Sequence, residues 1–166
     1  MSRRALVIFT FVLAALWIVL DQVSKYLAET FLELGKPHPL LGNWFELRLV
    51  YNPGAAFGLG TGYTWILTVI AGVVVVGLTV FALRVHRMTW ALVVGSMLGG
   101  AISHFYDRLL RGPEFANGHI VDFLNYGGLF VGNIADIALV AAAIGAVLLT
   151  MIGIPFSEPA HREPVK

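Results

Sequence analysis

Two aspartates in the last third of the chain have the clearest chemical potential. Asp122 lies in the stretch His-Ile-Val-Asp-Phe-Leu, and Asp136 lies in Asn-Ile-Ala-Asp-Ile-Ala-Leu. A carboxylate among apolar residues is costly in lipid and commonly serves a function. Two carboxyl groups that meet cannot both ionise cheaply, so one keeps a proton. The pattern predicts an acid–base pair: the ionised member takes a proton from water, and the protonated member polarises a carbonyl and later serves the leaving amine.

Spacing alone leaves other interpretations of these aspartates open. They could be two independent charges, one at the membrane interface and one satisfied by a neighbouring helix. A divalent metal held by His104, His119, Asp122 and Asp136 is a further alternative. The chain has no H-E-x-x-H or similar ligand spacing, however, and it has no cysteine to supply a thiolate.

Two further charged pairs stand at the ends of apolar stretches. Asp21 and Lys25 are four residues apart, which places them on one face of a helix. They form either a simple helix-end ion pair or, if they face other helices, a site that orients a polar substrate group. Asp107 and Arg108 are either a pair that reaches out to the membrane boundary or a place where Arg108 binds a carboxylate or phosphate-like group.

The composition indicates that these charged side chains belong to a membrane protein. Of 166 residues, 58% are hydrophobic and 13% are charged, and the mean hydropathy is +0.80. This is too little polar surface for a water-soluble domain, so we expect an integral membrane protein with one domain over residues 1–154. Residues 155–166 are expected to form a disordered cytoplasmic tail. The net charge of +1 gives no basic field for nucleic acid.

Four stretches are long and apolar enough to span a membrane: residues 5–23, 64–83, 89–106 and 130–152. The first is long for a signal peptide and lacks a cleavage site, so it is expected to stay as a helix. Basic residues flank the first span, fill the link between the second and third, and lie in the tail. They place both termini in the cytoplasm.

The segments on the other side of the membrane have patterns of their own. Residues 27–34 form an amphipathic continuation of the first helix that ends at Gly35, which predicts a short interfacial helix. Residues 44–51 alternate, with Phe45, Leu47, Leu49 and Tyr51 on one face, which is typical of a strand. We therefore expect a small sheet at the outer surface.

Five motifs in order resemble the bacterial lipoprotein signal peptidases, also called signal peptidase II. They are D-Q-V-S-K at 21–25, N-P-G-A-A-F-G at 52–58, G-G-A with D-R-L at 99–101 and 107–109, V-D-F at 121–123, and N-I-A-D at 133–136. The resemblance covers residues from about 5 to 152. It implies an all-α membrane protein of four transmembrane helices, with a small extracytoplasmic β-sheet and a short interfacial helix.

The resemblance also implies an activity and a site. The reaction removes the signal peptide from a diacylglyceryl-modified prolipoprotein by cutting before the lipidated cysteine. Asp122 and Asp136 match the catalytic pair. The residues implied to surround the substrate and the pair are Asp21, Lys25, Asn52, Gly54, Arg108 and Asn133. No metal or other cofactor is implied. The expected protein is a monomer in the bacterial cytoplasmic (inner) membrane, in contact with its lipids, with the active site near the extracytoplasmic face.

The chain departs from the family pattern at two places. Ser103-His104 stands where the family has Gly-Asn, and Gly132 stands where it commonly has Phe. His104 is counted among the site residues because histidine can donate and accept hydrogen bonds and titrates near neutral pH. The alternatives to the enzyme are a non-catalytic lipopeptide-binding protein and a proton-relay protein of the same fold.

Overall fold

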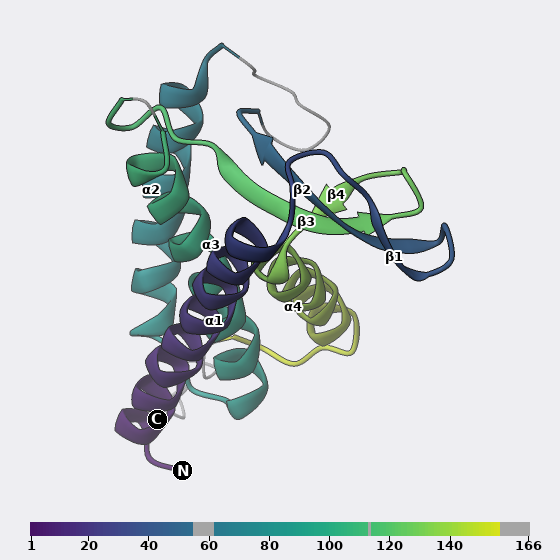
Figure 1. Ribbon diagram of the computed structural model, residues 1–166. Helices are drawn as coiled ribbons and strands as arrows, with labels where there is room; N and C mark the ends of the chain where they lie inside the picture. Colours follow the sequence, from purple (N-terminus) through teal and green to yellow (C-terminus); the bar gives the residue numbers. More distant parts are fainter. Residues whose placement is uncertain (55–61, 113, 157–166) are drawn as a thin grey trace, which may run out of the picture.

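The computed structural model describes residues 1–54, 62–112 and 114–156. Four helices run side by side, and a sheet stands at one end of them (Figure 1). The elements in chain order are α1 (Arg3–Phe31), β1 (His38–Leu41), β2 (Phe45–Asn52), α2 (Thr64–Ala82), α3 (Met88–Leu110), β3 (Ile120–Tyr126), β4 (Val131–Gly132) and α4 (Ile134–Met151).

The prediction of four membrane spans is confirmed. Within the described residues, all four helices are long and apolar enough to cross a membrane. Their outward faces carry exposed apolar side chains such as Val12 and Leu16 of α1 and Val69 and Val73 of α2. Such a surface would be a liability in water, but it is what lipid requires.

Glycines let α3 approach its neighbours closely on two sides. A Cβ on Gly99 would lie 2.7 Å from the carbonyl oxygen of Ala14 in α1. A Cβ on Gly100 would lie 3.0 Å from the carbonyl oxygen of Ala135 in α4. Small residues give membrane helices this close backbone approach. As a result, α3 lies between α1 and α4, and its polar residues can reach both.

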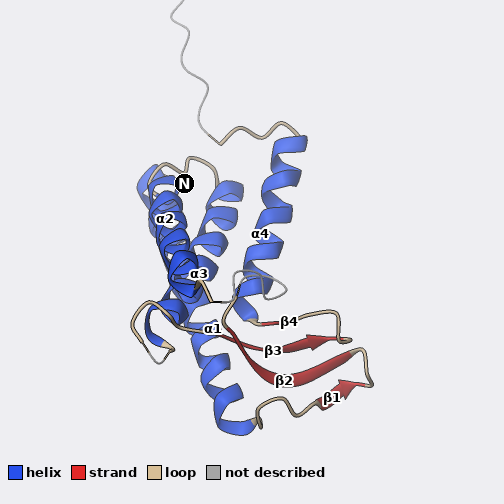
Figure 2. Ribbon diagram, turned by 90° about the horizontal axis from the view of Figure 1, so that it is seen from above, coloured by secondary structure: helices blue, strands red, loops and turns tan. Residues whose placement is uncertain are grey.

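The sheet is antiparallel, with the strand order β1-β2-β3-β4. Figure 2 shows it at the end of the bundle opposite the N-terminus. The strand predicted at residues 44–51 is confirmed as β2. Its alternation does not persist, because the pairing of β2 with β3 shifts register between Leu47 and Val50. Leu49 is therefore buried at 3% exposure, whereas Tyr51, predicted on the same face, is 41% exposed.

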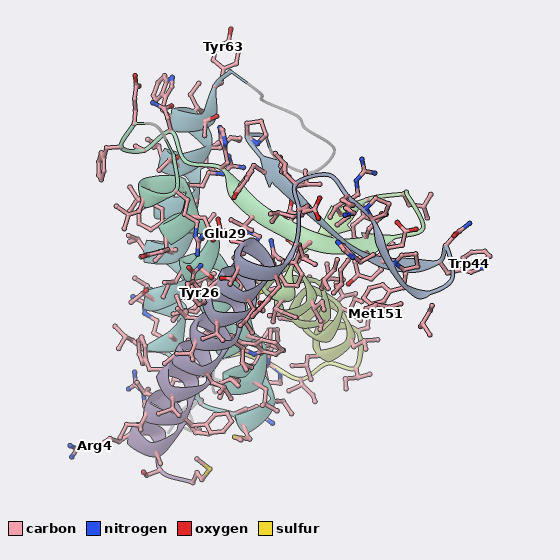
Figure 3. All side chains as sticks on the ribbon, in the orientation of Figure 1. Arg4, Tyr26, Glu29, Trp44, Tyr63 and Met151 are labelled. Atoms are coloured by element: carbon pink, nitrogen blue, oxygen red, sulfur yellow. The ribbon has the colours of Figure 1, made fainter. Side chains whose placement is uncertain are left out.

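Three predicted boundaries differ from the observed ones. The amphipathic segment 27–34 is no separate helix, because α1 continues without a break to Phe31; Arg4 and Glu29 mark its opposite ends in Figure 3. The fourth span begins at Ile134 rather than at residue 130, because Val131 and Gly132 pair with β3. The third span extends beyond residue 106 to Leu110. Most of the predicted loop 52–58 and almost all of the tail 155–166 lie outside the described residues.

Candidate active site

A cavity of about 450 Å³ opens where the sheet meets the helices. Apolar side chains of α2 and α4 form part of its wall, and polar side chains from four elements or loops form the rest. The polar residues that line it are Asn52, His104, Arg108, Asp122 and Asp136, together with the backbone of Gly54. All six were predicted site residues, so the cavity brings together groups that are as far as 84 positions apart in the chain (136 minus 52).

Asp122 is held on β3, where it lies opposite Val50 of β2. Its side chain is buried, and both carboxyl oxygens accept hydrogen bonds. Asn133 Nδ2 donates to Oδ1 at 2.6 Å, and Asn52 Nδ2 donates to Oδ2 at 3.1 Å. Burial and the neighbouring Asp136 carboxylate raise the pKa of Asp122 from 3.8 to about 7, against the opposite effect of the two amides. Asp122 is therefore the member of the pair suited to carry a proton at neutral pH.

Asp136 sits in the first turn of α4, because the helix begins at Ile134 and not at residue 130 as the predicted fourth span did. Asn133 caps that helix, and its Oδ1 accepts from the backbone N–H of Asp136 at 3.0 Å. In return, Asp136 Oδ2 accepts from the backbone N–H of Asn133 at 2.9 Å. This capping box places the carboxylate at the N-terminus of α4, where the helix dipole is positive.

Asn133 connects the two carboxyl groups directly. Its amide nitrogen donates to Asp122, while its backbone N–H and side-chain oxygen both bond to Asp136. Its side chain is fully buried. One side chain thus fixes both aspartates relative to each other, and the charge of one is felt by the other.

Arg108 fastens the loop that follows β2. Its guanidinium donates to the carbonyl oxygen of Pro53 at 2.8 Å, to that of Gly118 at 3.3 Å, and also to that of Gly54. The backbone N–H of Gly54 donates in turn to Asn52 Oδ1 at 3.0 Å. Arg108 was considered a ligand for a carboxylate or a phosphate-like group. In the described structure its hydrogen bonds go to three backbone carbonyls, and they position the loop beside Asp122.

Asp21 and Lys25 lie behind the cavity in a buried ionic cluster. Lys25 Nζ is 2.5 Å from Asp21 Oδ2 and 2.7 Å from Asp107 Oδ2, and all three side chains are 0% exposed. Ser103 Oγ donates to Asp21 Oδ2 at 2.6 Å. Asp21 Oδ1 accepts from the backbone N–H of Ala135 at 2.8 Å. The expectation that Asp21 and Lys25 contact substrate is therefore not met, because neither has exposed surface; they hold the start of α4 against α1 and α3.

Sequence reasoning missed the other members of this cluster. Asp107 was interpreted as a boundary charge, but it is fully buried. Gln22 Nε2 donates to Ser103 Oγ at 2.8 Å and to Asp107 Oδ1 at 2.9 Å. A lysine is almost never fully buried without partners. A Lys25 that faces other helices therefore predicts a second carboxylate partner besides Asp21, and Asp107 fills that role.

The four residues of the metal alternative do not come together as a ligand set. In the ranges that the structure describes, no group of three or more His, Cys, Asp or Glu side chains is arranged to hold a metal ion. His104 and both aspartates line the cavity, whereas His119 is not among its lining residues.

Known proteins match this chain over most of its length. The family model described as signal peptidase (SPase) II matches residues 13–153. A lipoprotein signal peptidase of Rhodococcus jostii is 42% identical over 153 residues, which cover 92% of this chain and 76% of that protein. One of Mycobacterium avium is 43% identical over 150 residues, which cover 90% of this chain and 82% of that protein.

The fold is also similar to solved structures. A bacterial membrane enzyme solved by the in meso method at 2.3 Å resolution superposes with a TM-score of 0.77, at 23% identity, over 95% of this chain and 94% of the other. A second such structure, at 1.9 Å resolution, gives a TM-score of 0.74 at 22% identity, over 88% of this chain and 94% of the other. These likenesses confirm the four-helix membrane fold with its small sheet.

Proposed function

This chain belongs to the signal peptidase II family, and from that premise we propose that it is an aspartic endopeptidase whose catalytic pair is Asp122 and Asp136. The family and its curated relatives make the chain a bacterial multi-pass membrane protease that removes signal peptides from prolipoproteins. The aspartic mechanism rests mainly on one observation: the two aspartates line one cavity, share Asn133, and differ in burial.

In the proposed reaction, Asp136 acts as the base and Asp122 as the acid. The Asp136 carboxylate takes a proton from a water molecule, and the water oxygen forms a bond to the carbonyl carbon of the scissile peptide. Asp122 gives its proton to the carbonyl oxygen, so a neutral tetrahedral intermediate results. When the C–N bond breaks, the proton on Asp136 passes to the leaving nitrogen, and a hydroxyl proton returns to Asp122. Both aspartates regain their starting states, and no metal or cofactor takes part.

The remaining site residues act through these two. Asn52 and Asn133 hold the Asp122 carboxyl group in place by their amide hydrogen bonds. Arg108 and Gly54 set the path of the loop at the mouth of the cavity. Asp21 and Lys25 secure the start of α4 from behind. Catalysis benefits because groups held by several partners need no reorganisation during the reaction.

The finer features of substrate and location belong to the same proposal. The substrate is a prolipoprotein whose cysteine already carries a diacylglyceryl group, and the cut precedes that cysteine. The enzyme lies in the cytoplasmic membrane as a monomer among lipids, with both termini in the cytoplasm. The cavity then faces the extracytoplasmic side. The placement of the sheet and cavity at the end of the bundle opposite the N-terminus supports this orientation (Figure 2).

Replacement of each aspartate by asparagine tests the proposal. Asp122→Asn and Asp136→Asn keep the size of each side chain but remove the proton exchange, so each should lower kcat by at least a thousandfold while the lipopeptide still binds. The assay is a gel shift with purified protein in detergent and a diacylated precursor. Glu33→Gln, at an exposed position, is the matched control and should cleave at the wild-type rate.

Cleavage near the wild-type rate by both asparagine variants would contradict the assignment of Asp122 and Asp136 as the catalytic pair. Binding without cleavage by the wild-type protein would favour the lipopeptide-binding alternative. Proton flux through liposomes without hydrolysis would favour the proton relay.

A further inference from the structure

The two carboxylate oxygens of Asp136 have different surroundings. Oδ2 accepts from the backbone N–H of Asn133 and lies beside the backbone of Gly132, where an added Cβ would be only 2.9 Å away. This oxygen is committed to the helix cap. The Asp136 side chain is nevertheless 39% exposed and lines the cavity. Oδ1 is therefore the oxygen left to accept a proton from water.

Among the described residues, His104 supplies the polar side-chain contact to Oδ1. Its Nε2 lies 3.5 Å from Asp136 Oδ1 and 3.3 Å from Asn133 Oδ1. Both oxygens are acceptors, because the Asn133 amide nitrogen is directed at Asp122 at 2.6 Å and fixes the orientation of that amide. Nε2 must therefore carry a hydrogen, which it donates to Asn133 Oδ1 at 3.3 Å while Asp136 Oδ1 lies within ion-pair distance at 3.5 Å. The ring can change its charge only at Nδ1.

We propose that His104 is a positioning residue for the peptidase reaction: its Nε2–H orients Asp136 Oδ1 toward the water, and a second proton on the ring weakens Asp136 as a base. This inference rests on the proposed function. A neutral ring steers the carboxylate without neutralising it. A charged ring places a cation beside the carboxylate, and the carboxylate then draws a proton from water less readily.

The charges around His104 come from three elements. Asp136 faces it from α4, Asp122 from β3, and Arg108 from one turn further along α3. The described α2 residues on the cavity wall, Leu67, Ile70 and Ala71, carry no charge. Asp122 becomes neutral as the pH falls, so Asp136 is the carboxylate that faces a cationic ring, while the hydrogen bonds of Arg108 go to backbone carbonyls.

Two substitutions separate the donor from the titration. His104→Leu removes the donor at similar size and should lower kcat at least tenfold, with KM changed less than twofold and Tm unchanged. His104→Gln places an amide nitrogen near the position of Nε2 and should restore kcat to within about threefold of wild type. Wild-type kcat in His104→Leu, or failure of His104→Gln to rescue, would overturn the positioning role.

The pH profile tests the titration. In the wild-type protein, kcat/KM should fall on the acid side of the pH profile as the ring gains its second proton. In His104→Gln, which cannot gain the second proton, this limb should move to lower pH by at least one unit. Coincident acid limbs in the two proteins would overturn the switching role, whatever the size of kcat.

The asparagine variants show which idea has failed. If Asp122→Asn and Asp136→Asn abolish cleavage and the His104 variants behave as wild type, then the catalytic pair stands and only this inference falls. If the asparagine variants still cleave the precursor, then the assignment of Asp122 and Asp136 as the catalytic pair is itself wrong.

Discussion

The surroundings of Asp122 oppose its ionisation more strongly than its hydrogen bonds favour it, so its pKa is raised to about 7. Burial is the larger cause, and the Asp136 charge adds to it. Asp136 belongs to the same network but sits at the positive N-terminus of a helix and lines the cavity. Two chemically identical side chains thus receive different roles from burial and helix position alone.

This difference predicts a stability effect of Asp122→Asn. The folded-state pKa of about 7 lies above the ordinary 3.8, so between these values the folded protein binds a proton that the unfolded chain has lost. Wild-type stability therefore falls as pH rises from about 4 to about 7, and the loss is complete above that window. Asparagine has no charge to bury. The variant should be more stable than wild type at pH 8, by roughly 2 kcal/mol, and should gain little at pH 4.

Thermal unfolding in detergent at the two pH values measures this effect. Glu33→Gln, on the exposed surface, should show no such pH-dependent gain. If Asp122→Asn is no more stable than wild type at pH 8, then Asp122 is not a buried acid with a raised pKa.

The sequence predicted the residues of the site better than their roles. The two aspartates, Asn52 and His104 were expected near one another, and they line one cavity. Which aspartate carries the proton was beyond the sequence, because it depends on burial, and burial depends on how strand and helix meet. The capping pattern of Asn133 and Asp136 was visible, however, and it would have placed Asp136 in the first turn of a helix.

At the scale of elements, the strand that carries Asp122 was not foreseen. Residues 120–126 are buried on both sides over most of their length, so they show no alternation of apolar and polar side chains. A short run of this kind, apolar apart from Asp122 and Asn125, does not distinguish a strand from a helix. The strand forms because β2 and β4 pair with it on its two edges, and those partners are distant in sequence.

The buried cluster predicts that α4 depends on α1 for its position. Asp21→Ala removes the acceptor for the Ala135 N–H and one of the two carboxylates around Lys25. The Ala135 N–H then lacks an acceptor, and the buried Lys25 keeps only one of its two carboxylate partners, Asp107. The protein should lose about 3 kcal/mol of stability or more, and cleavage should decrease because Asp136 is one residue beyond Ala135.

An exposed ion pair provides the control for this prediction. Glu33→Ala breaks the Lys36–Glu33 pair, which is 2.8 Å long and lies in solvent, and should change stability by less than about 0.5 kcal/mol. Thermal unfolding and the gel-shift assay measure both variants. Equal losses in Asp21→Ala and Glu33→Ala would show that the cluster does not hold α4.

At the scale of the whole molecule, the helices and the sheet have different roles. The helices present apolar faces to lipid, and their buried polar residues lie where the helices meet one another. The sheet extends from one end of the bundle, with Trp44 at its far tip (Figure 3). The cavity lies at the junction, and its wall includes apolar side chains such as Leu67, Ile70 and Val140 beside the aspartates. In the proposed orientation, a substrate held in the bilayer meets the carboxyl groups from the apolar side of the cavity.

This arrangement predicts how the enzyme treats substrates with and without lipid. Acyl chains contribute about 0.8 kcal/mol of membrane affinity per buried CH₂, so a diacylated precursor is concentrated in the layer that the cavity faces. A precursor of the same sequence without lipid lacks this gain but has the same scissile bond. We expect its kcat/KM to be lower by at least a hundredfold, mainly through a higher KM. The reason is that the attached lipid concentrates the scissile bond at the enzyme but does not change the chemical step. Kinetics of both precursors with the protein in lipid nanodiscs would measure this, with Asp136→Asn as the blank. Equal kcat/KM for the two would mean that the cavity accepts its substrate from water, and a lower kcat at equal KM would mean that the lipid takes part in aligning the bond.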